Sequence, residues 1–448
     1  MTPQSQSPEH SKALAEEICR TLVAQGHQAL LNGGCVRDLL LGRTPADYDV
    51  STDARPNQVA ELFPDSVMVG AQFGVVLVVG ESAQVEVATF RSDIGYSDGR
   101  HPDRVAFAQT PQEDVRRRDF TINGMMMDPR TGDILDFVGG RKDVEAGIIR
   151  AIGEPRARFE EDKLRMVRGV RFGARFGYQI EPKTFAAIRE LTPTINQVSA
   201  ERLRDELTKI LTEGAARRGF ELLDETGLLQ KLLPEITRMK GVQQPPEFHP
   251  EGDVFVHTLL LVEKLPAGVS PTLAWGALLH DVGKPTAFRS AAETGDRIRF
   301  DRHVEIGVRM AEDICSRYRF SNSESEQIVS LVANHMRFKD VPQMRESTLK
   351  RFVRLPAFDE HLELHRIDCL SSHGNLDNWE FVREFIRRTP PEQVRPPRLV
   401  TGDDLRDMGF VPGPEFKTVL GAVEDAQLEG RLTNREEALE YAKTLFSH

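Results

Sequence analysis

The alternation of apolar and polar residues predicts strands near the start of the chain. Apolar residues at helical spacing predict one helix from about Ser11 to Gln25, and the apolar stretch Gln28 to Leu31 after it predicts a strand. Two more apolar runs, Gly74 to Gly80 and Gln84 to Phe90, flank the turn-like segment GESA. These patterns together predict a small sheet with helices packed on it.

The rest of the chain has the periodicity of helices. Apolar residues recur at three and four positions from about 160 to 176 and again from 200 to 211, and similar patterns continue nearly to the end. Proline-rich segments interrupt the pattern at 241–252 (GVQQPPEFHPEG) and at 389–397 (TPPEQVRPP), and they are the best linker candidates. We therefore expect a sheet-containing first part and a helical second part.

The composition adds a size and a compartment to this picture. With 448 residues, of which 40% are hydrophobic and 28% charged, the chain is expected to be a soluble globular protein of roughly two to four domains. No apolar run approaches the ~18 residues of a membrane helix, and the polar start MTPQSQSPEHSK lacks a signal-peptide pattern. Four scattered cysteines form neither a disulfide framework nor a metal clip. We therefore expect a cytoplasmic protein without a membrane partner.

The net charge of −11 argues against a nucleic-acid partner when it is taken for the whole chain. The charge is unevenly distributed, however. Residues 141–218 contain 17 Lys and Arg against 12 Asp and Glu, a net of +5, which leaves −16 elsewhere. An anionic partner is therefore compatible with this segment.

Asp47 and Asp49 are the first candidates for chemistry. Side chains at positions i and i+2 of a strand point to the same face, so two carboxylates can hold hard cations between them. Phosphoryl transfer uses such cations, one at the attacking oxygen and one at the leaving pyrophosphate. A lone Asp-x-Asp pair is weak support, because two surface aspartates in a loop are common.

A glycine turn upstream strengthens this interpretation. Gly33 and Gly34 lead into the segment VRDLLLG, which predicts a turn followed by a helix N-terminus, where free N–H groups favour a phosphate. Arg37 can add a guanidinium to that cradle. We therefore predict that Gly34 and Arg37 contact the nucleotide and that Asp47 and Asp49 are catalytic Mg²⁺ ligands.

The segment LNGGCVRDLLLGRTPADYDVSTDA resembles the signature of the class II tRNA nucleotidyltransferase and poly(A) polymerase superfamily. The resemblance continues through EVATFRSDIGYSDGRHPDRVAF, VRRRDFTINGM, DFVGGRKDVEAGIIRAIGEPRARFEEDKLRMVRGVRFGARFGY and SAERLRDEL, and covers about residues 30–211. It implies an α+β fold: a polymerase-β-like nucleotidyltransferase head with a mixed sheet, then an all-helical neck, body and tail. It also implies template-free addition of CCA to the 3′ end of tRNA from CTP and ATP.

The resemblance assigns base selection to the residues that match its EDxxR motif, Asp162 and Arg165. Their acceptor and donors suit the N4/N3 edge of cytosine or the N6/N1 edge of adenine, whereas uracil and guanine present a carbonyl where the acceptor needs an amine. Steps of three along a helix place Arg168 and Arg171 on the same stripe as this pair. We expect both arginines to contact the triphosphate or the neck, together with Arg118 of the RRD block, although such a stripe is more often a solvated face.

Two positions extend or depart from the family pattern. Glu86 precedes Thr89-Phe90-Arg91 on a predicted strand and is a candidate third carboxylate near the metals. Gly124 stands in ING where the family usually has INA, a small steric change that leaves the chemistry intact but bears on the packing beneath the site.

A second group of ligand-type residues lies on the helical background. Neutral imidazoles and carboxylates are good transition-metal ligands. LAWGALLHDVGKP and HTLLLVEKL resemble blocks of the HD phosphohydrolase superfamily, which implies hydrolysis of a phosphoester, with 2′,3′-cyclic phosphodiesterase or phosphatase activity as examples. The alternative is a retained helical scaffold that grips RNA. The predicted ligands of Ni, Mn, Fe or Co in this HD site are His257, His280, Asp281, His303, His335 and Asp368.

These observations predict four parts and leave several activities open. We expect a nucleotidyltransferase head at 1–150, a base-reading and RNA-binding neck at 151–240, an HD domain at 241–390 and a helical tail at 391–448. Poly(A) polymerase and CC-only or A-only adding enzymes share the catalytic blocks, although the full-length loop between Phe90 and Pro102 argues against CC-only addition. A protein of another class, an HD phosphohydrolase with an RNA-binding head, is the further alternative.

Overall fold

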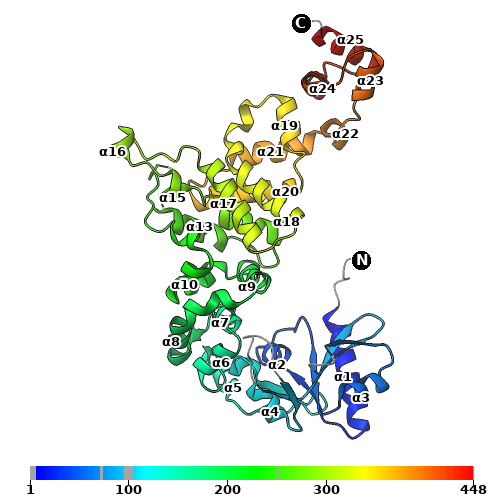
Figure 1. The fold of residues 1–448 in the computed structure, drawn as a ribbon, viewed down its shortest axis with the longest axis vertical. Coiled ribbons are helices and arrows are strands. Elements are labelled where there is room, and N and C mark those ends of the chain that lie inside the picture. The colour runs from blue at the N-terminus through cyan, green and yellow to red at the C-terminus, as the bar shows by residue number, and fades with distance from the viewer. Residues whose placement is uncertain (1–6, 71–73, 95–103, 248, 251, 447–448) are drawn as a thin grey trace. The chain divides into compact units, whose positions relative to one another are not determined.

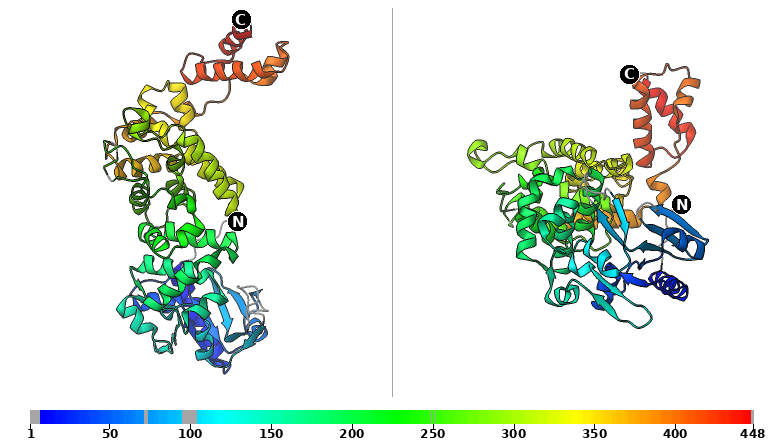
Figure 2. Two further views of the ribbon diagram at one scale, coloured as in Figure 1. Left: turned by 60° about the vertical axis from the view of Figure 1, so that its left-hand side comes forward. Right: turned by 60° about the horizontal axis from the view of Figure 1, so that its bottom comes forward.

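The computed structural model describes residues 7–70, 74–94, 104–247, 249–250 and 252–446. The chain forms two compact units, residues 1–237 and 238–448. Within the described residues all named strands belong to the first unit, whose ribbon runs from blue to green in Figures 1 and 2, and the second unit is helical. The expected α+β class is thereby confirmed, whereas the finer four-part division stays a prediction. The loop expected to distinguish CC-only enzymes falls largely on 95–103, outside the described residues.

Seven strands of the first unit form one mixed sheet in the order β3-β4-β5-β2-β1-β8-β9. Strands β2 and β5 are parallel, and every other neighbouring pair is antiparallel. Two small two-stranded sheets stand apart from it, β6 with β7 and β10 with β11. The strands are β1 (Ala29–Asn32), β2 (Asp49–Thr52), β3 (Ser66–Gly70), β4 (Val75–Val79), β5 (Gln84–Thr89), β6 (Arg91–Ile94), β7 (Arg104–Phe107), β8 (Met125–Met127), β9 (Ile134–Asp136), β10 (Ile148–Ile149) and β11 (Gln179–Ile180).

The strand register places the acidic residues of β2 and β5 side by side. On β5, Val85 and Val87 are buried and Glu86 is exposed, as expected for a strand with one buried face. Val50 of β2 pairs with Val87, so Asp49 lies next to Glu86 on the opposite face of the sheet. The alternation of the sequence thus sends the valines into the core and the carboxylates to one surface.

The helices of the head are short except the first. The helix over Pro8–Ala24 buries Ile18, Cys19 and Leu22 and packs against β1, β2 and β5. Its observed bounds agree with the predicted helix at 11–25 within a few residues. The head helices are α1 (Pro8–Ala24), α2 (Gly34–Leu40), α3 (Pro56–Leu62), α4 (Pro111–Arg116), η2 (Thr121–Asn123) and α5 (Gly140–Ala146).

The neck region contains a break that the periodicity did not predict. The single helix expected over 160–176 is two helices, because Asp162 adopts an extended conformation between them (φ −145°, ψ 106°). Its carboxylate accepts a hydrogen bond from the backbone N–H of Leu164, a local bond that competes with helix continuation. The helices are α6 (Pro155–Glu161), α7 (Leu164–Phe176), α8 (Pro182–Leu191), η3 (Thr192–Gln197), α9 (Ala200–Thr212), α10 (Ala216–Glu225), α11 (Leu228–Leu232) and α12 (Pro234–Thr237).

The second unit is built around two strongly apolar helices, α13 and α14. Trp275 of α14 is fully buried and packs edge-on against Phe320. Among the described residues, no helix combines the length and apolar character needed to cross a membrane. The helices are α13 (Val254–Glu263), α14 (Pro271–Leu279), α15 (Lys284–Ala287), α16 (Ala291–Thr294), α17 (His303–Arg317), α18 (Asn322–Asn334), η4 (His335–Gln343), α19 (Glu346–Phe352), α20 (Phe358–Ser371), α21 (Asp377–Arg388), α22 (Pro391–Val394), α23 (Gly402–Asp407), α24 (Pro414–Leu428) and α25 (Arg435–Phe446).

The two proline-rich segments connect helices, and their role as linkers between domains stays a prediction. The first lies between α12 and α13, inside the second unit, where Gln243 bridges to Asp253. The second contains the single turn α22. The C-terminal helices α23, α24 and α25 that follow have their own small apolar cluster, and Arg351 and Arg354 of the preceding helical part pair with Glu424 of α24.

Candidate functional site

Three carboxylates gather on one face of the head sheet. Asp47 is exposed just before β2, Asp49 is the first residue of β2, and Glu86 lies beside it on β5. The third carboxylate considered from the sequence is therefore next to the pair. Burial, together with the charges of Asp47 and Glu86, raises the pKa of Asp49 to about 7, although Arg118 acts in the opposite direction. A cation at these oxygens would relieve that repulsion, so the donor set fits Mg²⁺.

The glycine turn is closely packed against an arginine. Gly33 has a left-handed φ of 70° and precedes α2, and a Cβ on it would lie only 3.2 Å from Nη1 of Arg118. Arg118 donates from Nη1 to Oδ1 of Asn32 at 2.7 Å and from Nη2 to Oδ2 of Asp114 at 2.8 Å. Its guanidinium is thereby fixed on the same face of the sheet as Asp49, which keeps it a candidate for phosphate binding.

Arg37, which is predicted to add a guanidinium to the phosphate cradle, lies in a buried environment. Its buried guanidinium donates to Oδ1 of Asn123 at 2.6 Å, pairs with Asp38 at 2.8 Å and lies 4.5 Å from the ring centre of Phe176. Burial lowers its pKa, although Asp38 raises it in part. These contacts join Arg37 of the head to α7. The nucleotide contacts predicted for Arg37 and Gly34 stay predictions.

The departure at Gly124 has a packing explanation. A Cβ at this position would lie 2.8 Å from Cγ2 of Val138, 2.9 Å from Cδ1 of Ile152 and 3.2 Å from Cγ1 of Val115. The space that an alanine methyl group needs is filled by these three branched side chains. Glycine is therefore matched to the bulk beneath the site.

Asp162 is fixed from outside its own segment. Arg202 of α9 donates from Nη1 to Oδ1 at 3.2 Å and from Nη2 to Oδ2 at 2.7 Å, a two-point ion pair across 40 residues of sequence. Arg165 is held separately: Nη1 donates to Oε2 of Glu161 at 2.7 Å, and Nη2 donates to the carbonyl oxygen of Arg117 at 3.0 Å. The two predicted base-reading residues thus lie near the start of α7, each held by its own anchor.

Arg168 and Arg171 are engaged in ion pairs rather than exposed. Arg168 donates to Oδ2 of Asp119 at 2.7 Å. Arg171 is buried and donates from Nε to Oε2 of Glu206 at 2.7 Å and from Nη1 to Oε2 of Glu213 at 3.2 Å. Of the two roles expected for these arginines, these contacts favour the neck over the triphosphate, which stays a prediction.

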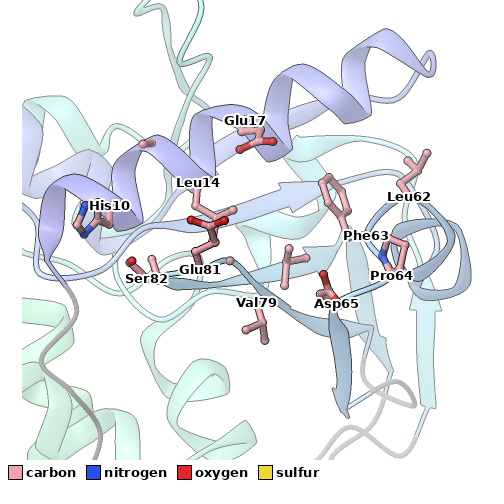
Figure 3. A pocket seen from close by; sticks show the side chains of 14 residues that line it. His10, Leu14, Glu17, Leu62, Phe63, Pro64, Asp65, Val79, Glu81 and Ser82 are labelled. Carbon is pink, nitrogen blue, oxygen red and sulfur yellow. The ribbon is translucent and has the colours of Figure 1, made fainter.

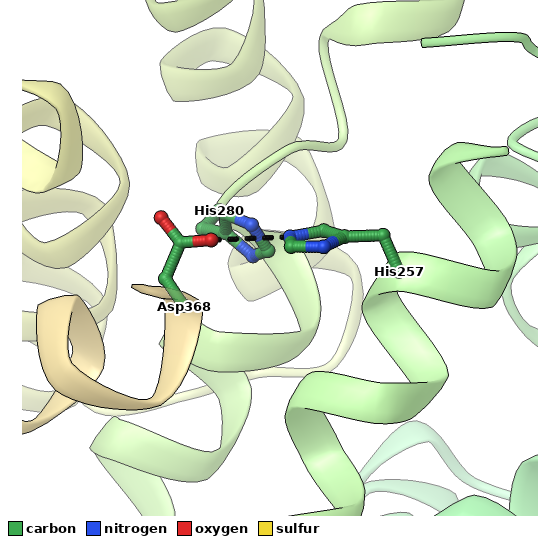
Figure 4. Close-up of side chains that lie close together, drawn as sticks. All are labelled: His257, His280 and Asp368. Carbon is green, nitrogen blue, oxygen red and sulfur yellow. Dashed lines mark ion pairs between the residues drawn. The ribbon is translucent and has the colours of Figure 1, made fainter. Parts of the chain in front are cut away.

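The six predicted HD residues converge in the second unit. Their ligand atoms form two groups, each within 4.8 Å: His257, His280 and Asp368, and then Asp281, His303 and His335. Figure 4 shows the first group, in which Nε2 of His257 lies 3.1 Å from Oδ1 of Asp368. The residues come from α13, the end of α14, α17, the end of α18 and α20, so only the tertiary fold assembles them.

Three of the histidines are oriented by the same local device. Nδ1 of His280, His303 and His335 lies 2.8, 2.9 and 2.7 Å from the backbone carbonyl oxygen three residues earlier, that of Ala277, Phe300 and Val332 respectively. Such a bond places the proton on Nδ1 and turns Nε2 inward. The Nε2 atoms of these three histidines are buried without a hydrogen-bond partner within the described part of the chain.

Burial and neighbouring charges keep the candidate ligands in the protonation states that bind a metal ion. Burial lowers the pKa of His335 to about 4 and lowers that of His303, so both imidazoles stay neutral. Although burial raises the pKa of Asp281, Lys284 and His280 lower it more, and it lies well below its usual range. Asp281 faces both groups: Oδ2 lies 3.2 Å from Nε2 of His280, and Oδ1 lies 3.7 Å from Nε2 of His335. The donor set therefore fits two divalent cations.

Four of the candidate HD ligands, Asp281, His303, His335 and Asp368, line a pocket of about 610 Å³. Cationic side chains contribute to its lining: Lys284, Arg297, Arg299 and Lys339. The carboxylates of Asp281, Asp301 and Asp368 line the same pocket, so the cationic side chains lie beside candidate metal ligands. Cationic groups next to a metal site suit a phosphoester substrate. A second pocket, of about 550 Å³, lies in the first unit between α1, the end of α3 and the β4–β5 turn (Figure 3). It is lined by His10, Leu14, Glu81 and their neighbours and contains none of the predicted site residues.

Several residues in these sites were not singled out from the sequence. Asp119 and Arg202 lie in quoted motif blocks, RRD and SAERLRDEL, and that was the signal available for them. Glu206 had the same signal but no assigned role. Gln244, whose Oε1 accepts from Nζ of Lys284 at 2.7 Å, lies in a predicted linker and had no signal at all.

Matches to protein families agree with this geometry. Residues 29–150 match the family described as the Poly A polymerase head domain, and residues 177–240 match the probable RNA- and SrmB-binding site of polymerase A. Residues 254–365 match the HD domain. Sheet, carboxylates and matches together define a nucleotidyltransferase that also contains an HD domain.

Relatives named CCA-adding enzyme match nearly the whole chain. The one from Geobacillus sp. is 42% identical over 424 residues, 94% of both chains, and the one from Levilactobacillus brevis is 31% identical over 432 residues, 96% of this chain and 97% of the relative. The crystal structure of the Bacillus stearothermophilus CCA-adding enzyme in complex with CTP superposes with a TM-score of 0.73 at 26% identity, covering 100% of this chain and 98% of that one. The chain belongs to the CCA-adding enzyme family.

Proposed function

We propose that this protein adds C, C and A to the 3′ end of tRNA from CTP and ATP, by Mg²⁺-dependent transfer without a nucleic-acid template. The observation that carries the proposal is the group of three carboxylates, Asp47, Asp49 and Glu86, on one face of a nucleotidyltransferase sheet. A relative of known structure was solved with CTP, which supports the choice of nucleotide. The relatives named CCA-adding enzyme support C, C and A as the nucleotides that are added.

The residues of the head would share the work of the transfer. Asp47 and Asp49 would hold the cation, which when bound promotes attack by the 3′ hydroxyl on the α-phosphate and offsets the charge on the departing pyrophosphate. Arg118, fixed by Asn32 and Asp114, would place a permanent positive charge near the triphosphate. Preorganised charge of this kind costs no reorganisation at the moment of reaction.

Base choice would fall to the neck. Asp162 would accept from the amine of cytosine or adenine, and Arg165 would donate to the neighbouring ring nitrogen. Uracil and guanine would leave a carbonyl against the carboxylate, and an unpaired polar contact of that kind is costly in a partly buried site. The +5 charge of residues 141–218 lies in this part of the chain and supports RNA binding there.

A primer-extension experiment tests the proposal. The protein is incubated with tRNA ending before CCA and with tRNA ending in CC, each with labelled CTP or ATP. We expect CTP to be added twice to the first and ATP once to the second, whereas long A tails on unrelated RNA would identify a poly(A) polymerase. Two CTP additions to the first tRNA with no ATP addition to the second would identify a CC-only enzyme, and ATP addition to the second with no CTP addition to the first would identify an A-only enzyme.

A carboxylate variant ties this activity to the head. We expect Asp49→Ala to reduce extension by more than about 100-fold, because a direct ligand is removed where even outer-shell changes cost 10–100-fold. Asp53→Ala, which removes a nearby carboxylate that accepts from the backbone N–H of Gln28, is the control and should keep extension within a few-fold. Unchanged extension by Asp49→Ala would remove these carboxylates from the mechanism.

A second activity is supported by the HD site. We propose that the two ligand groups around Asp281 hold divalent transition metals, with Ni, Mn, Fe or Co as candidates, and serve hydrolysis of a phosphoester such as a 2′,3′-cyclic phosphate. The buried Nε2 atoms that face the centre, and the cationic side chains in the adjoining pocket, favour this activity over a purely structural scaffold. If hydrolysis were the only activity and extension failed, the protein would be an HD phosphohydrolase with an RNA-binding head.

A further inference from the structure

We infer that Arg202 is a positioning residue for base selection: it holds the carboxylate of Asp162 in the one orientation that accepts an amine. The inference rests on the proposed role of Asp162 in reading the incoming base. It is drawn from the two-point ion pair between α9 and the break before α7, with distances of 3.2 and 2.7 Å.

The acceptor capacity of Asp162 is largely used within the protein. A carboxylate offers about four acceptor positions, two on each oxygen. Oδ1 accepts from the backbone N–H of Leu164 at 3.1 Å and from Nη1 of Arg202 at 3.2 Å. Oδ2 accepts from Nη2 of Arg202 at 2.7 Å. Among the contacts of the described residues, one acceptor position is therefore left, on Oδ2.

A single fixed acceptor can distinguish bases that a mobile one cannot. Cytosine and adenine place an amine at the exocyclic position and an acceptor nitrogen beside it, whereas uracil and guanine place a carbonyl there and an N–H beside it. A carboxylate free to turn can accept that N–H and so tolerate uracil. Arg202 prevents the turn, because both oxygens are bound to one planar guanidinium.

The anchor of Asp162 is a side chain from another helix. Arg165, the other member of the pair, is held by Glu161 and Arg158 of the preceding helix and by the carbonyl oxygen of Arg117. Asp162 is held by the guanidinium of Arg202, 40 residues further along the chain, so its orientation can be tested by changing one side chain. Its side chain is 15% exposed and that of Arg202 is 22% exposed, so an incoming base can still reach Oδ2.

The test compares nucleotide selectivity in the full-length protein. Single-nucleotide addition to tRNA ending before CCA is measured as kcat/KM for CTP and for UTP with the unmodified protein, Arg202→Gln, Arg202→Lys and Asp162→Asn. We expect Arg202→Gln to lower the ratio of CTP to UTP by about tenfold or more, the factor typical of losing a charge-assisted contact. Arg202→Lys keeps the charge but cannot form the two-point pair. Its ratio of CTP to UTP should therefore lie between that of the unmodified protein and that of Arg202→Gln.

The matched control is Arg204→Gln on the same helix. Arg204 pairs with Asp205 at 2.9 Å on the surface, so its loss removes the same charge without touching Asp162. We expect this variant to keep the CTP-to-UTP ratio within twofold. The ratio is insensitive to weaker tRNA binding, because the same tRNA is used with both nucleotides.

The outcomes separate this inference from the function on which it rests. If Asp162→Asn changes the ratio and both Arg202 variants leave it unchanged, Arg202 is not a positioning residue. If Asp162→Asn also leaves the ratio unchanged, the base-reading role itself is wrong. If Arg202→Gln fails to fold, as thermal unfolding would report, Arg202→Lys decides the question: an unchanged ratio overturns the inference and a lowered ratio supports it.

Discussion

At the scale of the residue, the pKa of each buried carboxylate depends on the charges of its neighbours. Asp49 has two like charges nearby, and burial with those charges raises its pKa to about 7. Burial also raises the pKa of Asp119, but Arg168 outweighs it, and the result is a pKa of about 2. The first arrangement suits a cation that arrives later, and the second suits a permanent structural pair.

The Asp119 pair leads to a prediction about acid stability. Its pKa is depressed, so it stabilises the folded state above the ordinary value near 4 and loses that contribution as the pH falls to about 2. The shift of nearly two pH units corresponds to about 2 kcal/mol. We expect Asp119→Asn to lower the stability of the first unit by about 2 kcal/mol at pH 7 and by much less near pH 2.

Hydrogen exchange of peptides from α7 is the suitable measurement, because both tryptophans, Trp275 and Trp379, lie in the second unit. Asp205→Asn, which removes a surface ion pair, should change exchange by less than the equivalent of about 0.5 kcal/mol. A loss of stability that is the same at pH 7 and pH 2 would contradict the assignment.

At the scale of the element, close approach of backbones assembles the HD site. A Cβ on Gly283 would lie 2.1 Å from the carbonyl oxygen of His303 and 2.6 Å from the backbone nitrogen of Gly307. The turn after Asp281 and the first turn of α17 can therefore meet only because position 283 has no side chain. With this contact in place, Nε2 of His303 lies 3.8 Å from Oδ1 of Asp281.

Gly283→Ala should separate these two elements. The atoms in the way are backbone atoms, which cannot turn aside as a side chain can, so we expect a loss of about 1–3 kcal/mol in the second unit. Trp275 fluorescence during denaturant unfolding measures it, and metal content of the purified protein should fall because His303 moves away from its partners. Gly402→Ala is the control, since a Cβ there meets nothing within 4 Å. Equal stability and metal content in both variants would contradict this explanation.

At the scale of the whole molecule, the two units offer two different sets of candidate metal ligands. The head offers carboxylate oxygens, which suit hard Mg²⁺, whereas the HD site offers imidazoles, which suit transition metals. The overall charge of −11 coexists with the positive segment at 141–218. The net charge describes the sum over both units and conceals the positive segment of the first unit.

Selective metal return should separate the two activities. After removal of metals by a chelator, we expect Mg²⁺ alone to restore nucleotide addition, and Ni²⁺ or Mn²⁺ to be needed for hydrolysis of 2′,3′-cyclic AMP. His335→Ala should lose hydrolysis and keep addition, and Asp49→Ala should show the reverse. Equal restoration of both activities by Mg²⁺ would argue against distinct sites.

Much of the fold could be predicted because its signals are local. The strands β1, β4 and β5, the helix α1 and the helical second half follow the expected periodicities, since burial of one face imposes period two or 3.6 on neighbouring residues. The break at Asp162 was missed because apolar spacing is preserved through it. A side-chain bond to one backbone N–H, which leaves no periodic mark, ends α6 there.

The sequence by itself determined the chemistry that was available: two aspartates two positions apart, a glycine turn, and the ordered series of histidines and aspartates. Only the tertiary structure decided which side chains from distant parts of the chain contact the residues of the two candidate sites. Arg202 meets Asp162, Arg168 meets Asp119 and Gly283 admits His303, each across at least 20 residues of chain. Spacing along a chain fixes the geometry of near neighbours, whereas pairing between elements depends on how their faces pack, and one residue's partner is not encoded next to it.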